Sequence, residues 1–160
     1  MSKLKLFALD AEDLEVISAH LQDAVVRIAD LRWLPDEQRF VIVVNRFDRS
    51  EPGKAGTYRR ARTALHFERV QSVRRRAIRQ DRADAVLNLL AVRFEETDAP
   101  AGTVELIFSA GGVIRLDVEC LEARLSDLGP VWSTSSVPDH ETGAAAAAAG
   151  ETGPAAREGA

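Results

Sequence analysis

The chain has 160 residues, of which 46% are hydrophobic and 29% charged, and its formal net charge is −4. These values are typical of one globular domain whose core needs no disulfide or structural metal. A single cysteine, Cys120, excludes an intramolecular disulfide and fits a reducing compartment. The N-terminal residues lack a signal-peptide pattern, and no apolar run approaches the roughly 20 residues of a membrane span. We therefore expect a cytoplasmic protein.

The first predicted element is a helix that begins after Asp10. This aspartate suits an N-cap, and the two acidic residues that follow favour the positive end of the helix dipole. Leu14, Ile17 and Leu21 then recur at helical spacing, which predicts that they face the core. The helix is expected to end near residues 22–23.

From residue 24 onward, alternating apolar residues predict strands. The first two, 24–33 and 39–47, flank a turn at Pro35 and would form a hairpin. Strand 39–47 is β-branched on both faces, so we expect both faces to be covered. Four further strands, after a loop at 48–57, are predicted at 64–73, 85–95, 104–108 and 114–120, with turns at 98–102 and 110–112.

The C-terminal part contains a second predicted helix and a tail. Leu121, Leu125 and Leu128 return to helical spacing, and the Gly129–Pro130 pair would end that helix. The predicted domain therefore covers residues 1–136. Residues 137–160 have no leucine, isoleucine or aromatic residue and are rich in alanine and glycine, which predicts a disordered tail.

The order of these elements predicts an α+β fold that is mostly antiparallel, because no helical crossover separates consecutive strands. We expect a bent sheet or half-open barrel closed by an N-terminal and a C-terminal helix. A pleckstrin-homology barrel is loosely similar in this respect. Such an analogy implies nothing about function.

Basic residues are concentrated in one part of the chain. Residues 54–82 carry ten basic and two acidic side chains, so the remainder has an excess of twelve negative charges. Arginine can bind a carboxylate or phosphate through two parallel hydrogen bonds. Six arginines are therefore candidates for binding an acidic protein surface or another anion: Arg59, Arg60, Arg62, Arg74, Arg75 and Arg76.

Two other interpretations of this basic segment stay open. The arginines could form a solvated face with internal salt bridges, as charged runs usually do. A nucleic acid is disfavoured as the partner without being excluded, because the whole chain is acidic and few aromatic residues lie near the arginines.

The residues that usually carry catalysis or bind metals form no recognisable motif. The three histidines are far apart, and no cysteine or histidine pair has ligand spacing, so we predict no metal site and no cofactor. Cys120 continues the alternating series Ile114, Leu116 and Val118, which favours a small buried hydrophobe over a nucleophile. The Gly111–Gly112 pair lacks the lysine and helix of a phosphate loop and indicates a hairpin turn.

These observations favour a non-enzymatic binding or adaptor module. One alternative is an enzyme whose pocket forms only when the chain folds. Another is a homo-oligomeric structural protein that uses strand 39–47 as its interface. The pocket candidates of the enzyme alternative are His20, Asp23, Asn45, Arg46, Arg115 and Glu119.

Several segments also carry a resemblance. They are residues 4–13, 20–24, 45–47 and 64–67, and the run GGVIRLDVEC at 111–120. Across roughly residues 4–140 the chain resembles an uncharacterised proteobacterial family, a domain of unknown function. The run at 111–120 is the most specific part of the match. The resemblance implies a bacterial protein and supplies no catalytic residue.

Overall fold

The computed structural model describes residues 3–48, 58–129 and 132–134. The predicted tail at 137–160 and most of the predicted loop at 48–57 lie outside these residues. The helix α1 covers Ala11–Leu21, and three 3-10 turns cover Ile28–Asp30, Pro35–Glu37 and Ser109–Gly111. The strands are β1 (Lys5–Ala8), β2 (Ala24–Arg27), β3 (Leu31–Leu34), β4 (Arg39–Asp48), β5 (Tyr58–Phe67), β6 (Val70–Arg76), β7 (Val86–Glu96), β8 (Gly102–Phe108), β9 (Val113–Val118), β10 (Ala123–Asp127) and β11 (Trp132–Thr134).

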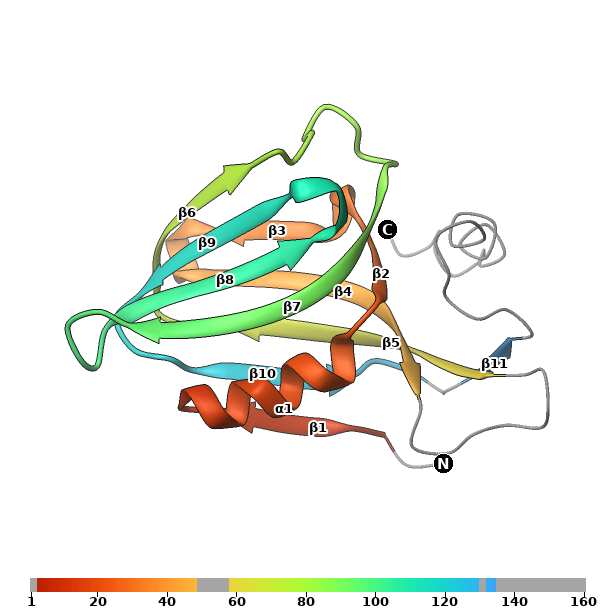
Figure 1. Cartoon of the computed structure of the whole chain (residues 1–160), viewed down its shortest axis with the longest axis horizontal. Helices are drawn as coiled ribbons and strands as arrows, with labels where there is room; N and C mark the ends of the chain where they lie inside the picture. The colour runs from red at the N-terminus through yellow and green to blue at the C-terminus, as the bar shows by residue number, and fades with distance from the viewer. Residues whose placement is uncertain (1–2, 49–57, 130–131, 135–160) are drawn as a thin grey trace.

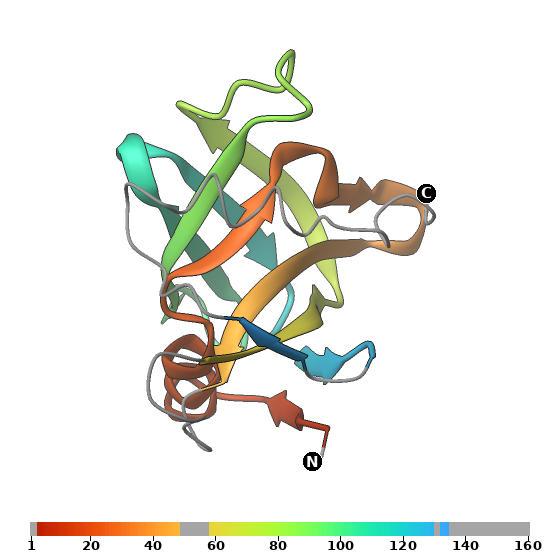
Figure 2. The same cartoon turned by 90° about the vertical axis from the view of Figure 1, so that its right-hand side faces the viewer.

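These strands form one antiparallel sheet, and the antiparallel prediction is confirmed. The path through the sheet is β1-β10-β5-β4-β2-β7-β8-β9-β6, while β3 pairs with β4 and β11 with β5. No pairing between described residues joins β1 to β6, so the sheet is open. It is strongly curved, so that its strands wrap around a common interior (Figures 1 and 2).

The core lies on the concave side of this sheet, because alternate residues of each strand point inward. In β4, Phe40, Ile42 and Val44 are fully buried, whereas Val41 and Val43 on the other face are half-buried. The expected cover over both faces of this strand is therefore only partial. The hairpin turn at 110–112 is present, with Ala110 and Gly111 at positive φ and a hydrogen bond from Phe108 N–H to the Gly112 carbonyl.

The helix α1 lies between β7 and β1 (Figure 1). Its predicted cap is confirmed, since the Asp10 carboxylate accepts a hydrogen bond of 2.8 Å from Asp13 N–H. Leu14, Ile17 and Leu21 are buried in the core as expected. Ser18 Oγ accepts a hydrogen bond from Val92 N–H at 2.9 Å, which fixes α1 against β7.

The predicted closure by two helices is wrong. Residues 121–128 contain strand β10, which pairs with β1 and β5, so α1 is the sole α-helix of the described residues and the sheet stays open. Leu121 and Leu125 are four positions apart, a spacing that puts residues on one side of a helix and also of a strand. Both are buried, whereas Leu128, the third member of the supposed helical stripe, is 51% exposed.

Other element boundaries also differ from the predictions. The strand expected at 24–33 is divided into β2 and β3 by a 3-10 turn, and the strand expected at 64–73 is divided into β5 and β6. The second division occurs at Arg69, which has a positive φ of 58°. Strand β1 has no counterpart in the prediction, because its four residues are too short for a clear alternation.

Candidate functional site

Two rows of side chains cross the convex face of the sheet from β1 to β3. In register, Phe7 pairs with Arg124, Arg124 with His66, His66 with Val41, and Val41 with Arg32. Opposed residues of antiparallel strands project from the same face. The second row begins at Lys5 and continues through Ser126, Ala64 and Val43. We call this surface the outer basic face, and its cations are Lys3, Lys5, Arg32, Arg62 and Arg124.

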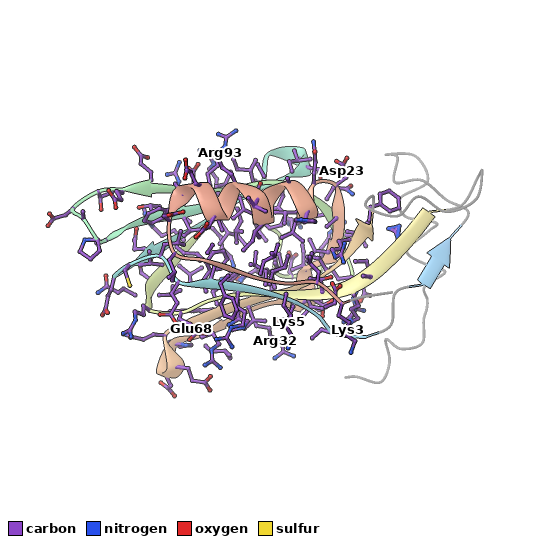
Figure 3. The ribbon with its side chains drawn as sticks, turned by 90° about the horizontal axis from the view of Figure 1, so that it is seen from below. Lys3, Lys5, Asp23, Arg32, Glu68 and Arg93 are labelled. Atoms are coloured by element: carbon purple, nitrogen blue, oxygen red, sulfur yellow. The ribbon has the colours of Figure 1, made fainter. Side chains whose placement is uncertain are left out.

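Four cations of the outer basic face have no acidic partner among the described residues. They are Lys3, Lys5, Arg32 and Arg124, all exposed, and no carboxylate in the described part of the chain lies within salt-bridge distance of them. The Arg124 guanidinium lies 4.9 Å from the centroid of the Phe7 ring, a cation–π arrangement. Figure 3 shows Lys3, Lys5 and Arg32 projecting on the side opposite α1 and Arg93.

One end of this face carries a paired cluster instead. Arg39 Nε donates to Glu68 at 2.9 Å, and His66 Nδ1 lies 2.8 Å from the same carboxylate oxygen. Partial burial raises the pKa of Glu68, but the contacts with His66 and Arg39 outweigh it and leave that pKa below its ordinary value. Arg62 is 3.9 Å from Asp30. Lys5, Arg32 and Arg124 on the strands, and Lys3 just before β1, are therefore the cations available to an external anion.

A buried polar cluster lies on the opposite, concave side of the same strands. Arg46 donates to both oxygens of Asp127, at 3.1 and 2.8 Å, and Thr63 Oγ1 donates to Asp127 at 2.7 Å. The Leu4 N–H donates to the same carboxylate at 2.7 Å. The side chains of Arg46 and Asp127 are 4% and 0% exposed, so the cluster is closed to solvent. We therefore interpret it as a cluster that stabilises the fold.

The six arginines predicted to bind an anion do not form one surface. Arg60 is buried, with its guanidinium 4.8 Å from the Phe47 ring, and this burial lowers its pKa. Arg62 belongs to the outer basic face, and the side chain of Arg59 lies outside the described set. Strands β5 and β6 are far apart along the path of the sheet, which separates these residues from the other three.

The second arginine group lies on β6, at an end of the sheet path. Arg74 is exposed and donates to Asp117 at 3.1 Å, and Arg76 is exposed on the same side of the strand. Arg75 alternates with them and pairs in register with the fully buried Ile114, so it points toward the concave side. Gln80 is the neighbour of Arg75. In the amide orientation that satisfies both groups, Gln80 Oε1 accepts a hydrogen bond from Arg75 Nη1 at 2.9 Å.

The six pocket candidates are not brought together. His20 is half-buried in the last turn of α1, Asp23 follows the helix with a positive φ of 65°, and Asn45 projects from the convex side of β4. Arg46 is in the buried cluster described above. On β9 and beyond it, Arg115 donates to Glu105 at 2.9 Å and Glu119 lies 4.0 Å from Arg69.

Sequence reasoning missed Lys5, Arg32 and Arg124, because they are isolated in sequence and lie outside the basic segment. Their proximity depends on strand pairing between β1, β10, β5, β4 and β3. A correct assignment of residues 123–127 as a strand would have placed Arg124 on a sheet face. Cys120 was predicted to be buried and is half-buried, on the lining of a cavity of about 470 Å³ at the start of α1.

Two general features of the described residues bear on the kind of site. They contain no group of three or more His, Cys, Asp or Glu side chains placed to hold a metal ion. Helix α1, with 11 residues, is too short to cross a bilayer.

The fold and the site define a single-sheet β domain with a basic convex face. The chain belongs to a family of proteins of unknown function (DUF2948), whose family model matches residues 4–140. The resemblance found in the sequence is thereby confirmed at the level of the family. Neither the curated proteins nor the solved structures gave a significant match.

Proposed function

We propose that this domain is a binding module that holds an acidic protein surface on its outer basic face. The observation that carries the proposal is the register that brings Lys5, Arg32 and Arg124 to one face, where the described residues provide them with no acidic partner. Adjacent strands are about 4.8 Å apart, so Arg32 and Arg124, three strand steps from each other, are separated by roughly 14 Å. Such a spacing suits several carboxylates on a protein surface better than one small anion.

The side chains between these cations support the same proposal. Val41, Val43, Ala64 and Ser126 are short, so a partner can approach the backbone plane of the sheet closely. No described element packs against this face. Opposite charges steer the encounter of two proteins and make the association rate depend on salt.

An acidic protein is a better partner for this face than a nucleic acid. Single-stranded nucleic acids are bound by exposed aromatic side chains on which bases stack. Phe7 is the exposed aromatic residue of the rows, and its ring is already in contact with Arg124.

The test is affinity capture by the full chain from a bacterial lysate, compared with the triple variant Lys5→Gln, Arg32→Gln and Arg124→Gln. A matched control replaces Arg74, Arg79 and Arg115 by glutamine, because each of these exposed arginines is already paired with an acid. We expect acidic proteins to be captured by the wild type and the control and lost in the triple variant, at about 0.05 M more than at about 0.3 M salt.

Two results would contradict the proposal. Equal capture by the triple variant and the wild type would show that the outer basic face is not the binding surface. Loss of capture after nuclease treatment would identify a nucleic acid as the bound polyanion.

A further inference from the structure

A cavity of about 180 Å³ lies between β3 and the segment that follows β6. It is lined by Ile28, Ala29, Leu31, Ile78 and Ala83, together with Arg75 and Gln80. Two backbone contacts mark the ends of the gap between β3 and β6. Val70 N–H donates to the Gln38 carbonyl at 2.8 Å, and Ala29 N–H donates to the Ala83 carbonyl at 3.0 Å. The cavity is thus a window in the wall of the curved sheet.

Arg75 is the one charged residue of the lining. Its strand position puts it on the concave side, opposite the fully buried Ile114 and next in alternation to Val73, which packs against the core. No carboxylate of the described residues lies within salt-bridge distance of it. Burial lowers its pKa, which is the expected effect on a cation held in an apolar environment without a counter-charge.

Arg46, the other arginine on the concave side, has the carboxylate partner that Arg75 lacks. Arg46 is neutralised by two hydrogen bonds to the Asp127 carboxylate. Arg75 has only the neutral amide oxygen of Gln80, which accepts from Nη1 at 2.9 Å and from Nε at 3.3 Å. A guanidinium carries five N–H donors, so the remaining donors of Arg75 are available to an anion. Arg75 is half-buried, and a partly desolvated charge without an opposite charge would gain from a bound anion.

We propose that this window binds a small apolar carboxylate, with its carboxylate on Arg75 and its hydrocarbon part against Ile28, Leu31 and Ile78. A single cation matches a single negative charge, and the apolar lining would leave the extra oxygens of a phosphate or sulfate without partners. Gln80 has a free NH₂ group that can donate to the second carboxylate oxygen. The volume corresponds to about six water molecules of liquid, which restricts the ligand to a small acid.

The site is separate from the outer basic face although both involve β3, because Arg32 pairs with Val41 on the convex side whereas Leu31, which lines the cavity, pairs with the buried Ile42. The carboxylate could belong to a free acid or to the C-terminus of a peptide, since both present the same group on an apolar stem. The experiment therefore uses both kinds of probe. The free acids are butyrate, hexanoate and benzoate, each compared with its neutral amide. The peptide is an acetylated tetrapeptide ending in leucine, with a free or an amidated C-terminus.

Binding is followed on the full chain by NMR, through the methyl signals of Ile28, Leu31 and Ile78. We expect saturable shifts with at least one free carboxylate and none with its matched amide. Arg75→Gln should weaken this binding at least tenfold, whereas Arg76→Gln, the exposed neighbour on the same strand, should not change it. Binding of the free acids would identify a free acid as the ligand, and binding of the tetrapeptide would identify the C-terminus of a peptide.

A second variant protects the test against a folding defect in Arg75→Gln. Ile78→Phe keeps Arg75 and fills the cavity, so it should abolish the methyl shifts while the amide spectrum of the core stays native. The proposal is overturned if no carboxylate shifts these methyl signals, if the amides bind equally well, or if Arg75→Gln binds as the wild type does. None of these outcomes depends on the outer basic face.

Discussion

Arg46 and Asp127 are 81 positions apart in sequence and meet inside the curved sheet as a two-bond ion pair with almost no solvent exposure. Thr63 and the Leu4 N–H complete the set of donors to the carboxylate. The cluster therefore links β4, β5 and β10 to the start of β1. Because each charge is buried, each depends on the other for its solvation.

Removing one member of this pair is expected to destabilise the domain strongly. Arg46→Met leaves the Asp127 carboxylate buried without its cation, and losses of about 3–5 kcal/mol are typical of such a change. The double variant Arg46→Met with Asp127→Leu removes both charges and should be less destabilised than the sum of the single variants. Urea unfolding of the four proteins of this cycle measures the coupling. Additive losses would show that the pair does not act as a unit.

The same cluster predicts how stability depends on pH. Burial raises the pKa of Asp127, but the hydrogen bonds from Arg46, Leu4 and Thr63 outweigh it and leave that pKa below its ordinary value. A carboxyl whose folded-state pKa is lowered contributes stability above its unfolded pKa, and this contribution is lost as pH falls through the folded value. Stability should therefore decline below about pH 4, the unfolded value for aspartate.

Thr63→Val tests this assignment, because valine keeps the shape of threonine and removes the hydroxyl donor to Asp127. We expect a loss of about 1–3 kcal/mol at neutral pH, the range for a hydrogen bond to a buried charged group. Without this donor the folded-state pKa of Asp127 is less depressed, so the difference from the wild type should shrink as pH falls. Urea unfolding at neutral pH and at several acidic values gives this comparison. A difference that is constant with pH would exclude Asp127 as its cause.

Features determined by neighbouring residues could be predicted from the sequence. The cap at Asp10 and the hairpin turn at 110–112 each depend on a few adjacent residues, and both are present. The strand at 123–127 could not be distinguished from a helix, because Leu121 and Leu125 fit both periods. Its backbone pairs with β1 and β5, which are distant in sequence, and this pairing decides the conformation.

The candidate site was less predictable than the fold for a similar reason. Clustering in sequence identified the arginines of residues 59–76, but strand alternation and the distance between β5 and β6 separate them in space. The outer basic face is assembled instead from single cations on β1, β3 and β10. Arg75 illustrates the difference, since it was grouped with Arg74 and Arg76 and yet lies on the opposite side of β6.

Gly102 is expected to be intolerant of any side chain. A Cβ atom at this position would lie 2.5 Å from the Glu95 carbonyl oxygen and 2.6 Å from the Phe94 ring. Gly102→Ala should therefore destabilise the domain by about 1–3 kcal/mol, the usual cost of overpacking. Gly129→Ala is a matched control, because nothing lies within 4 Å of its added Cβ. Thermal unfolding of both variants measures the contrast, and equal midpoints would contradict the predicted clash.

The cations of the outer basic face should be dispensable for folding. Lys5, Arg32 and Arg124 are exposed and have no acidic partner among the described residues, so their neutralisation breaks no ion pair. Surface substitutions of this kind usually change stability by less than about 0.5 kcal/mol. The cation–π contact of Arg124 with Phe7 adds at most about 1 kcal/mol at an exposed site.

Urea unfolding of Lys5→Gln, Arg32→Gln and Arg124→Gln, singly and combined, measures this directly. We expect the single variants at Lys5 and Arg32 to unfold at the wild-type midpoint and the Arg124 variant slightly earlier. A combined loss well above about 1.5 kcal/mol, more than the surface changes and the ring contact together allow, would assign these residues a structural role. Near-native stability would instead mean that lost partner capture in the triple variant reports the binding surface itself.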